Sequence, residues 1–340
     1  MRTTLLLLML AVSPANAMRG PYIVNATTGS VRFCWRDTQD HCATWQDLEA
    51  GKPFLYEIQG KLRTASTLPL PGGKIRFAAF GDSGRGNNKQ KRVAAAVEAY
   101  KPQFVVVLGD IVYPRGKDKH YDEKYFDPYR KTLERIPFFP VIGNHDYGNY
   151  IFQNEKAAQR LQTYKKIHHR PRYYSFSVGG VDFFSIDTNK EGYNINPAAS
   201  ILKGSDQWNW LEGELRKSKA LWKIALMHVP AYSSGGHGSS LSVRAALHPL
   251  FKKYGVALVL QGHDHHYERS RSIDGTVYVV AGTGGSKVGK LRKKPREIWS
   301  EFTLGSIGFL GVEIQGARLR LEFFDADGQL RDYSEITKLQ

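Results

Sequence analysis

Five short apolar runs, each ending in a cluster of polar residues, most constrain the fold of this chain. Each run is long enough for one buried strand of a parallel sheet. Stretches with the apolar spacing of helices lie between several of them. From Lys74 onward this alternation predicts an α/β fold. The five runs are residues 75–80, 104–108, 138–142, 222–227 and 256–260.

The polar clusters after these runs contain residue types that bind metal ions. Ligand sites in α/β sheets lie beyond the carboxyl ends of the strands, so we expect the clusters to meet in one place. Each cluster alone has an ordinary explanation, such as a turn or a buried core histidine, but five in the same context are not expected by chance. Oxygen and nitrogen ligands without thiolate suit zinc, manganese or iron. Pooled, the clusters supply Asp82, Asp110, Tyr113, Asn144, His145, His228, His263 and His265.

Even seven of these eight residues are too many ligands for one catalytic metal that keeps open positions. They suit two metals that share a carboxylate. Two ions ~4 Å apart can hold both the attacking and the departing oxygen of a phosphoryl transfer. The sequence therefore favours a dinuclear site.

The clusters form five ordered motifs: Gly81-Asp82-x-Gly84, Gly109-Asp110-x-x-Tyr113, Gly143-Asn144-His145-Asp146, His228 and Gly262-His263-x-His265. Together they resemble the motifs of the calcineurin-like metallophosphoesterases, and within that group the purple acid phosphatases. The resemblance spans residues 74–285. It implies a four-layer α/β/β/α sandwich with a two-metal centre.

The resemblance also implies a role for each residue. His145 would protonate the leaving oxygen or bind the phosphate. His237, in a Gly/Ser-rich loop, is similar to the phosphate-contacting histidine of the family, and a loop histidine without a role is the alternative. The implied ligands are Asp82, Tyr113 and His265 for the first metal, Asp110 as the bridge, and Asn144, His228 and His263 for the second.

Tyr113 bears on the identity of the metals. Many related phosphoesterases carry Asp-x-His in the first motif. Here position 84 is Gly instead of His, and Tyr113 lies four positions after Gly109 in the second motif. An unperturbed phenol has a pKa near ~10, so its ionisation requires a strong Lewis acid. This exchange favours Fe(III) beside a divalent Fe, Zn or Mn ion.

The implied activity is that of an acid phosphatase that hydrolyses phosphate monoesters, on small molecules or proteins, by attack of a metal-bound hydroxide. A phosphodiesterase or nucleotidase on the same scaffold is an alternative, because the motifs set the metals while loops set the substrate. A non-catalytic binding protein is another, and the complete ligand set argues against it. The formal charge of +16 favours anionic substrates, and we find no specific nucleic-acid motif.

The N-terminal quarter differs from the rest. Residues 1–17 are expected to be a cleaved signal peptide, with Arg2, a short apolar run and a small-residue cleavage site, which predicts a secreted or periplasmic protein without a membrane span. Residues 18–70 are expected to form a small β-rich module that resembles a truncated fibronectin-III-like domain, followed by a catalytic domain over 74–340.

Cys34 and Cys42 are the only cysteines. In an oxidising compartment we expect them to form a disulfide, with two unrelated thiols as the alternative. Two basic segments, 165–172 with His168 and His169, and 287–296, are expected to be exposed loops.

Overall fold

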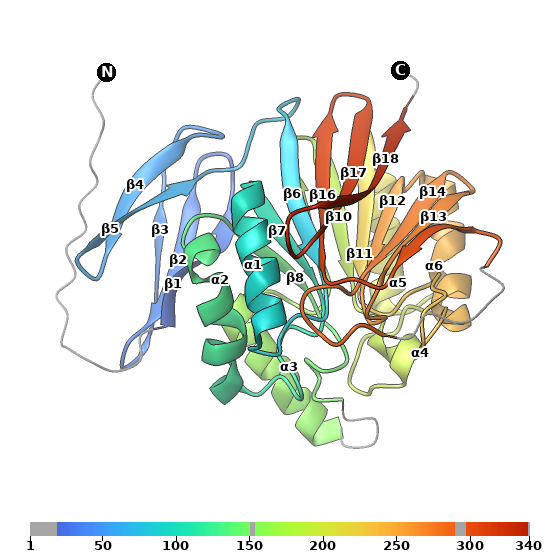
Figure 1. The fold of residues 1–340 in the computed structure, drawn as a ribbon, viewed down its shortest axis with the longest axis horizontal. Coiled ribbons are helices and arrows are strands. Elements are labelled where there is room, and N and C mark those ends of the chain that lie inside the picture. Colours follow the sequence, from blue (N-terminus) through green and yellow to red (C-terminus); the bar gives the residue numbers. More distant parts are fainter. Residues whose placement is uncertain (1–18, 150–153, 290–296, 339–340) are drawn as a thin grey trace.

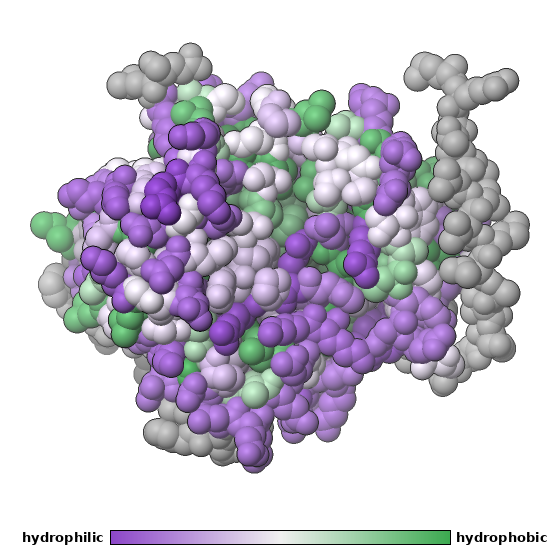
Figure 2. Space-filling model, turned by 180° about the vertical axis from the view of Figure 1, so that it is seen from behind, coloured by the Kyte–Doolittle hydropathy of each residue, from purple (hydrophilic) through white to green (hydrophobic). Residues whose placement is uncertain are grey.

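The computed structural model describes residues 19–149, 154–289 and 297–338, and it places two β-sheets face to face between helices (Figure 1). The expected signal peptide and most of the basic segment 287–296 lie outside the described residues. Among the described helices, none is long and apolar enough to cross a bilayer. The face turned away in Figure 1 is covered largely by hydrophilic side chains, with smaller hydrophobic areas between them (Figure 2).

The first sheet has six strands. β6, β7 and β8 are parallel, and an antiparallel meander extends the sheet beyond β6. In sheet order the strands are β18 (Leu330–Thr337), β17 (Arg318–Asp325), β16 (Gly308–Gln315), β6 (Ile75–Phe80), β7 (Phe104–Leu108) and β8 (Phe138–Val141).

The second sheet has seven strands, of which β10, β11, β12 and β14 are parallel. β14 is parallel to β12 but antiparallel to β13. After β12 the chain skips one strand position and forms β13, and β14 then fills the position between β12 and β13. In sheet order the strands are β15 (Ser300–Leu304), β13 (Tyr267–Ile273), β14 (Thr276–Ala281), β12 (Leu258–Gln261), β11 (Trp222–Met227), β10 (Val181–Ile186) and β9 (Tyr174–Val178).

Helices cover the outer face of each sheet, which confirms the four-layer α/β/β/α fold. On β6, Phe77 and Ala79 pack between the sheets, whereas Ala78 and Phe80 pack beneath the helices, as the two-residue period of a strand requires. The helices over the six-stranded sheet are α1 (Asn88–Tyr100), α2 (Asp127–Leu133) and α3 (Asn154–His168). Two short helical turns, η1 (Asp118–His120) and η2 (Asp122–Phe126), lead into α2. Those over the seven-stranded sheet are α4 (Asn189–Tyr193), α5 (Asp206–Lys217) and α6 (Leu241–Tyr254).

The N-terminal segment forms five strands that pack against the larger body. The rings of Phe33 and Tyr56 stack with their centroids 4.1 Å apart, and both belong to the buried cluster that contains Phe77. The disulfide between Cys34 and Cys42 is present, as expected. The likeness of this N-terminal segment to a truncated fibronectin-III-like module stays a prediction. The strands are β1 (Arg19–Ala26), β2 (Val31–Arg36) and β3 (Asp40–Trp45) in one sheet, and β4 (Pro53–Ile58) and β5 (Lys61–Ser66) in a hairpin.

The expectation of an exposed basic loop over residues 165–172 is wrong for its first half. Residues 165–168 complete α3, and His168 is buried among the rings of Tyr121, Tyr125 and Tyr164. The lysines point away because Ala157, Leu161 and Tyr164 place the apolar face of the helix against the core at helical spacing.

Candidate metal centre

The predicted ligand residues follow the carboxyl ends of strands from both sheets. β6, β7 and β8 run parallel in one sheet, and β11 and β12 run parallel in the other. Their polar ends therefore gather at one edge of the sandwich. The residues implied as ligands are buried there, with the exception of the half-buried His265.

One set of donor atoms surrounds the phenol of Tyr113. Its hydroxyl oxygen lies 3.1 Å from Asp82 Oδ1, 2.8 Å from Asp110 Oδ2 and 3.2 Å from His265 Nε2. Two ligands bound at right angles to one ion at ~2.1 Å are ~3 Å apart. The spacing of these four atoms therefore fits a common metal ion.

A second set of donor atoms surrounds the amide oxygen of Asn144. His228 Nε2 lies 3.0 Å and His263 Nδ1 lies 3.1 Å from Asn144 Oδ1. Asp110 Oδ1 is 3.3 Å from His228 Nε2. Oxygen and imidazole nitrogen at this spacing fit a second ion equally well.

Asp110 belongs to both sets through different oxygen atoms. Its Oδ2 faces Tyr113, and its Oδ1 faces His228. The backbone N–H of His145 also donates to Oδ1 at 2.9 Å, which fixes the carboxylate plane. This is the arrangement that a carboxylate shared by two ions needs.

The histidine rings are oriented by backbone carbonyls. The Nδ1 atoms of His228, His265 and His145 lie 2.7, 3.0 and 2.6 Å from the carbonyl oxygens of Leu108, Lys287 and Pro114. A carbonyl only accepts, so each Nδ1 carries the proton and donates. Each Nε2 is then free to bind a metal or exchange a proton.

The motif glycines make the close approach of these residues feasible. A Cβ at Gly109, whose φ is +84°, would lie 2.4 Å from His228 Nδ1. A Cβ at Gly143 would lie 2.3 Å from the backbone nitrogen of Asp110. Asp82 and Asp110 themselves have φ values of 60° and 52°, a region costly for non-glycine residues, and such outliers cluster at functional sites.

The electrostatics of the site favour a cation. Burial raises the pKa of Tyr113 well above its usual value, and the carboxylates of Asp110 and Asp82 raise it further. Burial by itself also raises the pKa of Asp82, but the hydrogen bond with His265 and the charge of His228 outweigh it and lower this pKa. Two buried carboxylates and a phenol, with no lysine or arginine among the donors, fit metal ions better than protons.

The two residues predicted to act on substrate lie at the rim. His145 Nε2 is 3.9 Å from Asp110 Oδ2, and its side chain is 24% exposed. His237 is exposed, with its ring centroid 4.3 Å from that of His263. The guanidinium of Arg85 lies 3.6 Å above the ring of Tyr113, and its Nε donates to Ser286 Oγ at 3.1 Å. The structure thus brings all nine predicted residues together, while their roles stay predictions.

Two buried carboxylates that the sequence did not single out as site residues hold the loop that carries His237. Asp264 accepts hydrogen bonds from the backbone N–H groups of His237 and Gly238. Glu268 accepts from the N–H of Ser234 at 2.8 Å and from its hydroxyl. Asp264 lies in the sequence between two predicted ligands, His263 and His265. The motif pattern therefore identified the two histidines and not the aspartate between them.

In the structure Glu268 Oε2 is 3.0 Å from His266 Nε2, whereas Arg269 pairs with Asp332 at 2.7 Å.

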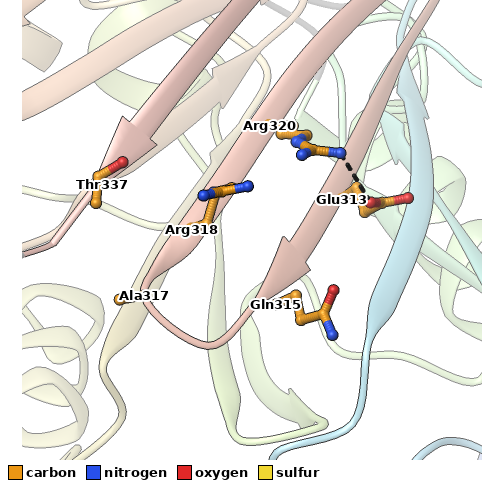
Figure 3. Close-up of a pocket in the computed structure, with 6 residues that line it drawn as sticks. All are labelled: Glu313, Gln315, Ala317, Arg318, Arg320 and Thr337. Carbon is orange, nitrogen blue, oxygen red and sulfur yellow. Dashed lines mark ion pairs between the residues drawn. The ribbon is translucent and has the colours of Figure 1, made fainter.

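A shallow hollow of ~320 Å³ lies at the opposite end of the six-stranded sheet (Figure 3). Arg320 pairs there with Glu313 at 3.6 Å, and Arg318 pairs with Glu335 at 3.2 Å. Ile314 in β16 pairs with Ile75 at the start of β6, so this hollow is remote from the predicted ligands after the end of β6. Its charges compensate one another, and it takes no part in the candidate centre.

Comparison with known proteins agrees with this geometry. The calcineurin-like phosphoesterase family model matches residues 75–267. The chain belongs to this phosphoesterase family. A model of the iron/zinc purple acid phosphatase-like C-terminal domain matches residues 275–333. The phosphoesterase assignment makes the protein a metal-dependent phosphoesterase, and the second match is to a domain named after the purple acid phosphatases.

Similar proteins carry the same family name. Purple acid phosphatase 3 of Arabidopsis thaliana is 28% identical over 286 residues, which is 76% of each chain. Purple acid phosphatase 7 of the same plant is 26% identical over 84% of this chain and 94% of its own length. A purple acid phosphatase from yellow lupin shares the fold with a TM-score of 0.80 at 19% identity, over 95% of this chain and 74% of the lupin chain.

Proposed function

We propose that this phosphoesterase is an acid phosphatase that hydrolyses phosphate monoesters at a centre of Fe(III) and a divalent Fe, Zn or Mn ion. In this proposal Asp82, Tyr113 and His265 hold the first ion, and Asn144, His228 and His263 hold the second. The observation that carries it is Asp110, whose two oxygens face different donor sets. When bound, the ions would activate the attacking water and offset the charge of the phosphate.

The side chains at the rim would complete the reaction. His145 donates from Nδ1 to the carbonyl of Pro114, so its Nε2 can hold a proton and deliver it to the leaving oxygen. His237 lies beside His263 on the other side and would contact the phosphate. Arg85 places a positive charge above Tyr113, where it would attract the anionic substrate.

We also propose that the protein is exported. The support is residues 1–17, with their positive start, short apolar run and small-residue cleavage site. The disulfide is consistent with an oxidising compartment.

A binding role without catalysis is the alternative that one comparison raises. A protein described as GAP50, the anchor in the inner membrane complex of Plasmodium, shares the fold with a TM-score of 0.64 at 24% identity, over 78% of this chain and 90% of its own. The intact donor sets around Tyr113 and Asn144 favour the enzyme.

The test compares hydrolysis of an aryl phosphate monoester and an aryl phosphate diester by the metal-loaded enzyme and by His145→Ala. We expect preference for the monoester, and a drop in kcat of ~10²-fold or more in the variant at unchanged metal content, because a general acid contributes about that much. His41→Ala is the matched control, because His41 lies in β3 and pairs only locally with Asp37. Preference for the diester would overturn the substrate assignment, and two bound metals without hydrolysis would indicate a binding protein.

A further inference from the structure

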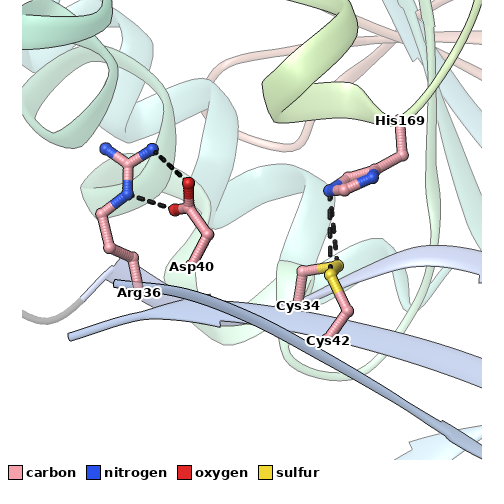
Figure 4. Close-up of a disulfide and its surroundings, with 5 residues drawn as sticks. All are labelled: Cys34, Arg36, Asp40, Cys42 and His169. Carbon is pink, nitrogen blue, oxygen red and sulfur yellow. Dashed lines mark hydrogen bonds and ion pairs between the residues drawn. A yellow bond between two sulfur atoms is a disulfide. The ribbon is translucent and has the colours of Figure 1, made fainter. Parts of the chain in front are cut away.

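A disulfide and a histidine in the N-terminal region form a second group of potential metal ligands. Cys34 in β2 and Cys42 in β3 lie opposite each other on paired strands and are bonded. His169 points at this bond from the end of α3 (Figure 4). Its Nε2 lies 3.4 Å from Cys34 Sγ and 3.9 Å from Cys42 Sγ. All three ligand atoms lie within 4.8 Å of one another.

The backbone at His169 is adapted to this placement. His169 directly follows the helix, with a φ of 52°, and its N–H donates to the carbonyl of Lys165 at 2.9 Å. This left-handed position after a helix is usually glycine or asparagine, because a side chain there is costly. The chain accepts that cost at a residue whose imidazole contacts both sulfur atoms.

The accessibility of the group suits metal binding. Cys42 and His169 are exposed, so a reductant and a metal ion can reach the group.

We propose that Cys34, Cys42 and His169 form a redox-gated site for a thiolate-binding divalent metal such as zinc. A dithiol reductant supplies two electrons, the S–S bond breaks, and the reductant becomes its own disulfide. Metal binding then releases the two thiol protons, and water fills the fourth position. Sulfur and nitrogen bound tetrahedrally to zinc are ~3.6 Å apart, from bond lengths of ~2.3 and ~2.0 Å, so His169 already stands at the required distance from both sulfurs and only these must separate.

The site is independent of the dinuclear centre in chemistry as well as in place. The donor sets around Asp110 contain oxygen and nitrogen atoms, whereas the sequence has two cysteines in total, both in the proposed site. Absorption from a thiolate–metal bond can therefore arise only here. An experiment can therefore refute the thiolate site without bearing on the phosphatase proposal.

The test is a titration of the reduced, full-length protein, with its dinuclear centre already loaded, with Co²⁺, followed in the near ultraviolet for thiolate-to-cobalt charge transfer. We expect the band to appear only after reduction, to saturate at one ion per chain and to be displaced by Zn²⁺. Cys34→Ser with Cys42→Ser should abolish the band. Loss even of a group that orients a ligand costs ~10–100-fold in metal affinity, so His169→Ala should lower the Co²⁺ affinity by at least ~100-fold. Replacement of His41, a half-buried histidine of the same sheet, with Ala should leave the affinity unchanged.

Absence of the band from a chain with two titratable free thiols would overturn the proposal, as would a band that His169→Ala leaves unchanged. If reduction lowers stability, a thermal melt keeps the test decisive. With the dinuclear centre already loaded, Zn²⁺ should then raise the Tm of the reduced wild type and not that of reduced His169→Ala, and an equal rise in both would refute the site.

Discussion

Replacement of Asp264 with Asn should release the loop that carries His237 without removing a predicted metal ligand. The buried carboxylate of Asp264 accepts hydrogen bonds from the N–H of His237 at 2.9 Å, the N–H of Gly238 at 3.1 Å and the hydroxyl of Ser233. An amide keeps one acceptor oxygen and turns an NH₂ group toward these donors. At least one buried N–H therefore loses its acceptor.

The size of the effect follows from the hydrogen bonds. A bond to a charged group contributes about 1.5–3 kcal/mol, and a buried donor left without an acceptor costs a similar amount. We take about 3 kcal/mol as the cost to the observed loop conformation, which corresponds to ~150-fold in its population. If His237 contacts the phosphate, kcat/KM should fall by up to ~100-fold, whereas metal content should stay the same.

The assay is steady-state hydrolysis of an aryl phosphate, with metal analysis on the same samples. His237→Ala should give a comparable loss, and adding it to Asp264→Asn should cost little more, because both act through one loop. Asp274→Asn is the matched control, since Asp274 pairs with His248 and Lys252 at the surface and should change little. Unchanged kcat/KM in Asp264→Asn would refute the positioning argument, and loss of metal would move Asp264 into the metal site.

Two further changes test the centre and the core. Asp110→Asn should abolish binding of both ions, because each donor set loses an anionic oxygen, and metal analysis showing two ions per chain would contradict the bridging role. His168→Phe should make the free energy of unfolding less dependent on pH on the acid side of neutrality. Burial lowers the pKa of His168 to about 3, whereas in the unfolded chain it is ~6.5. Between these two pH values the unfolded chain binds a proton that the folded chain does not. The free energy of unfolding therefore decreases as the pH is lowered through this window. Urea unfolding should show the wild type losing about 2 kcal/mol more than the variant between pH 8 and pH 5, and equal losses would contradict a neutral buried imidazole.

The layers and the position of the site were predictable because the strands that carry them are buried on both faces. Residues 104–108 are a continuous apolar run and residues 222–227 are apolar except for Lys223; polar clusters follow both runs, and each forms a strand with those bounds. The helix α3 was missed because its exposed faces carry many charged residues and its buried positions are spaced across four turns.

Other features depend on tertiary contacts that the sequence does not display. The role of Asp264 in holding the loop at His237 emerges only when two segments more than twenty residues apart meet. His168 is charged in an isolated chain at acid pH and becomes a buried core residue only through three tyrosines from elsewhere. The direction of β14 follows from the path of β13 rather than from its own residues.

The most direct test of the account is the visible absorption spectrum of the purified enzyme, with iron, zinc and manganese determined on the same sample. The account predicts a purple or pink charge-transfer band with two metals per chain, one of them iron, and loss of that band in Tyr113→Phe, since Tyr113 lies among the first donor set. A colourless protein with two divalent ions, or a band that survives Tyr113→Phe, would contradict ligation of Fe(III) by this tyrosine.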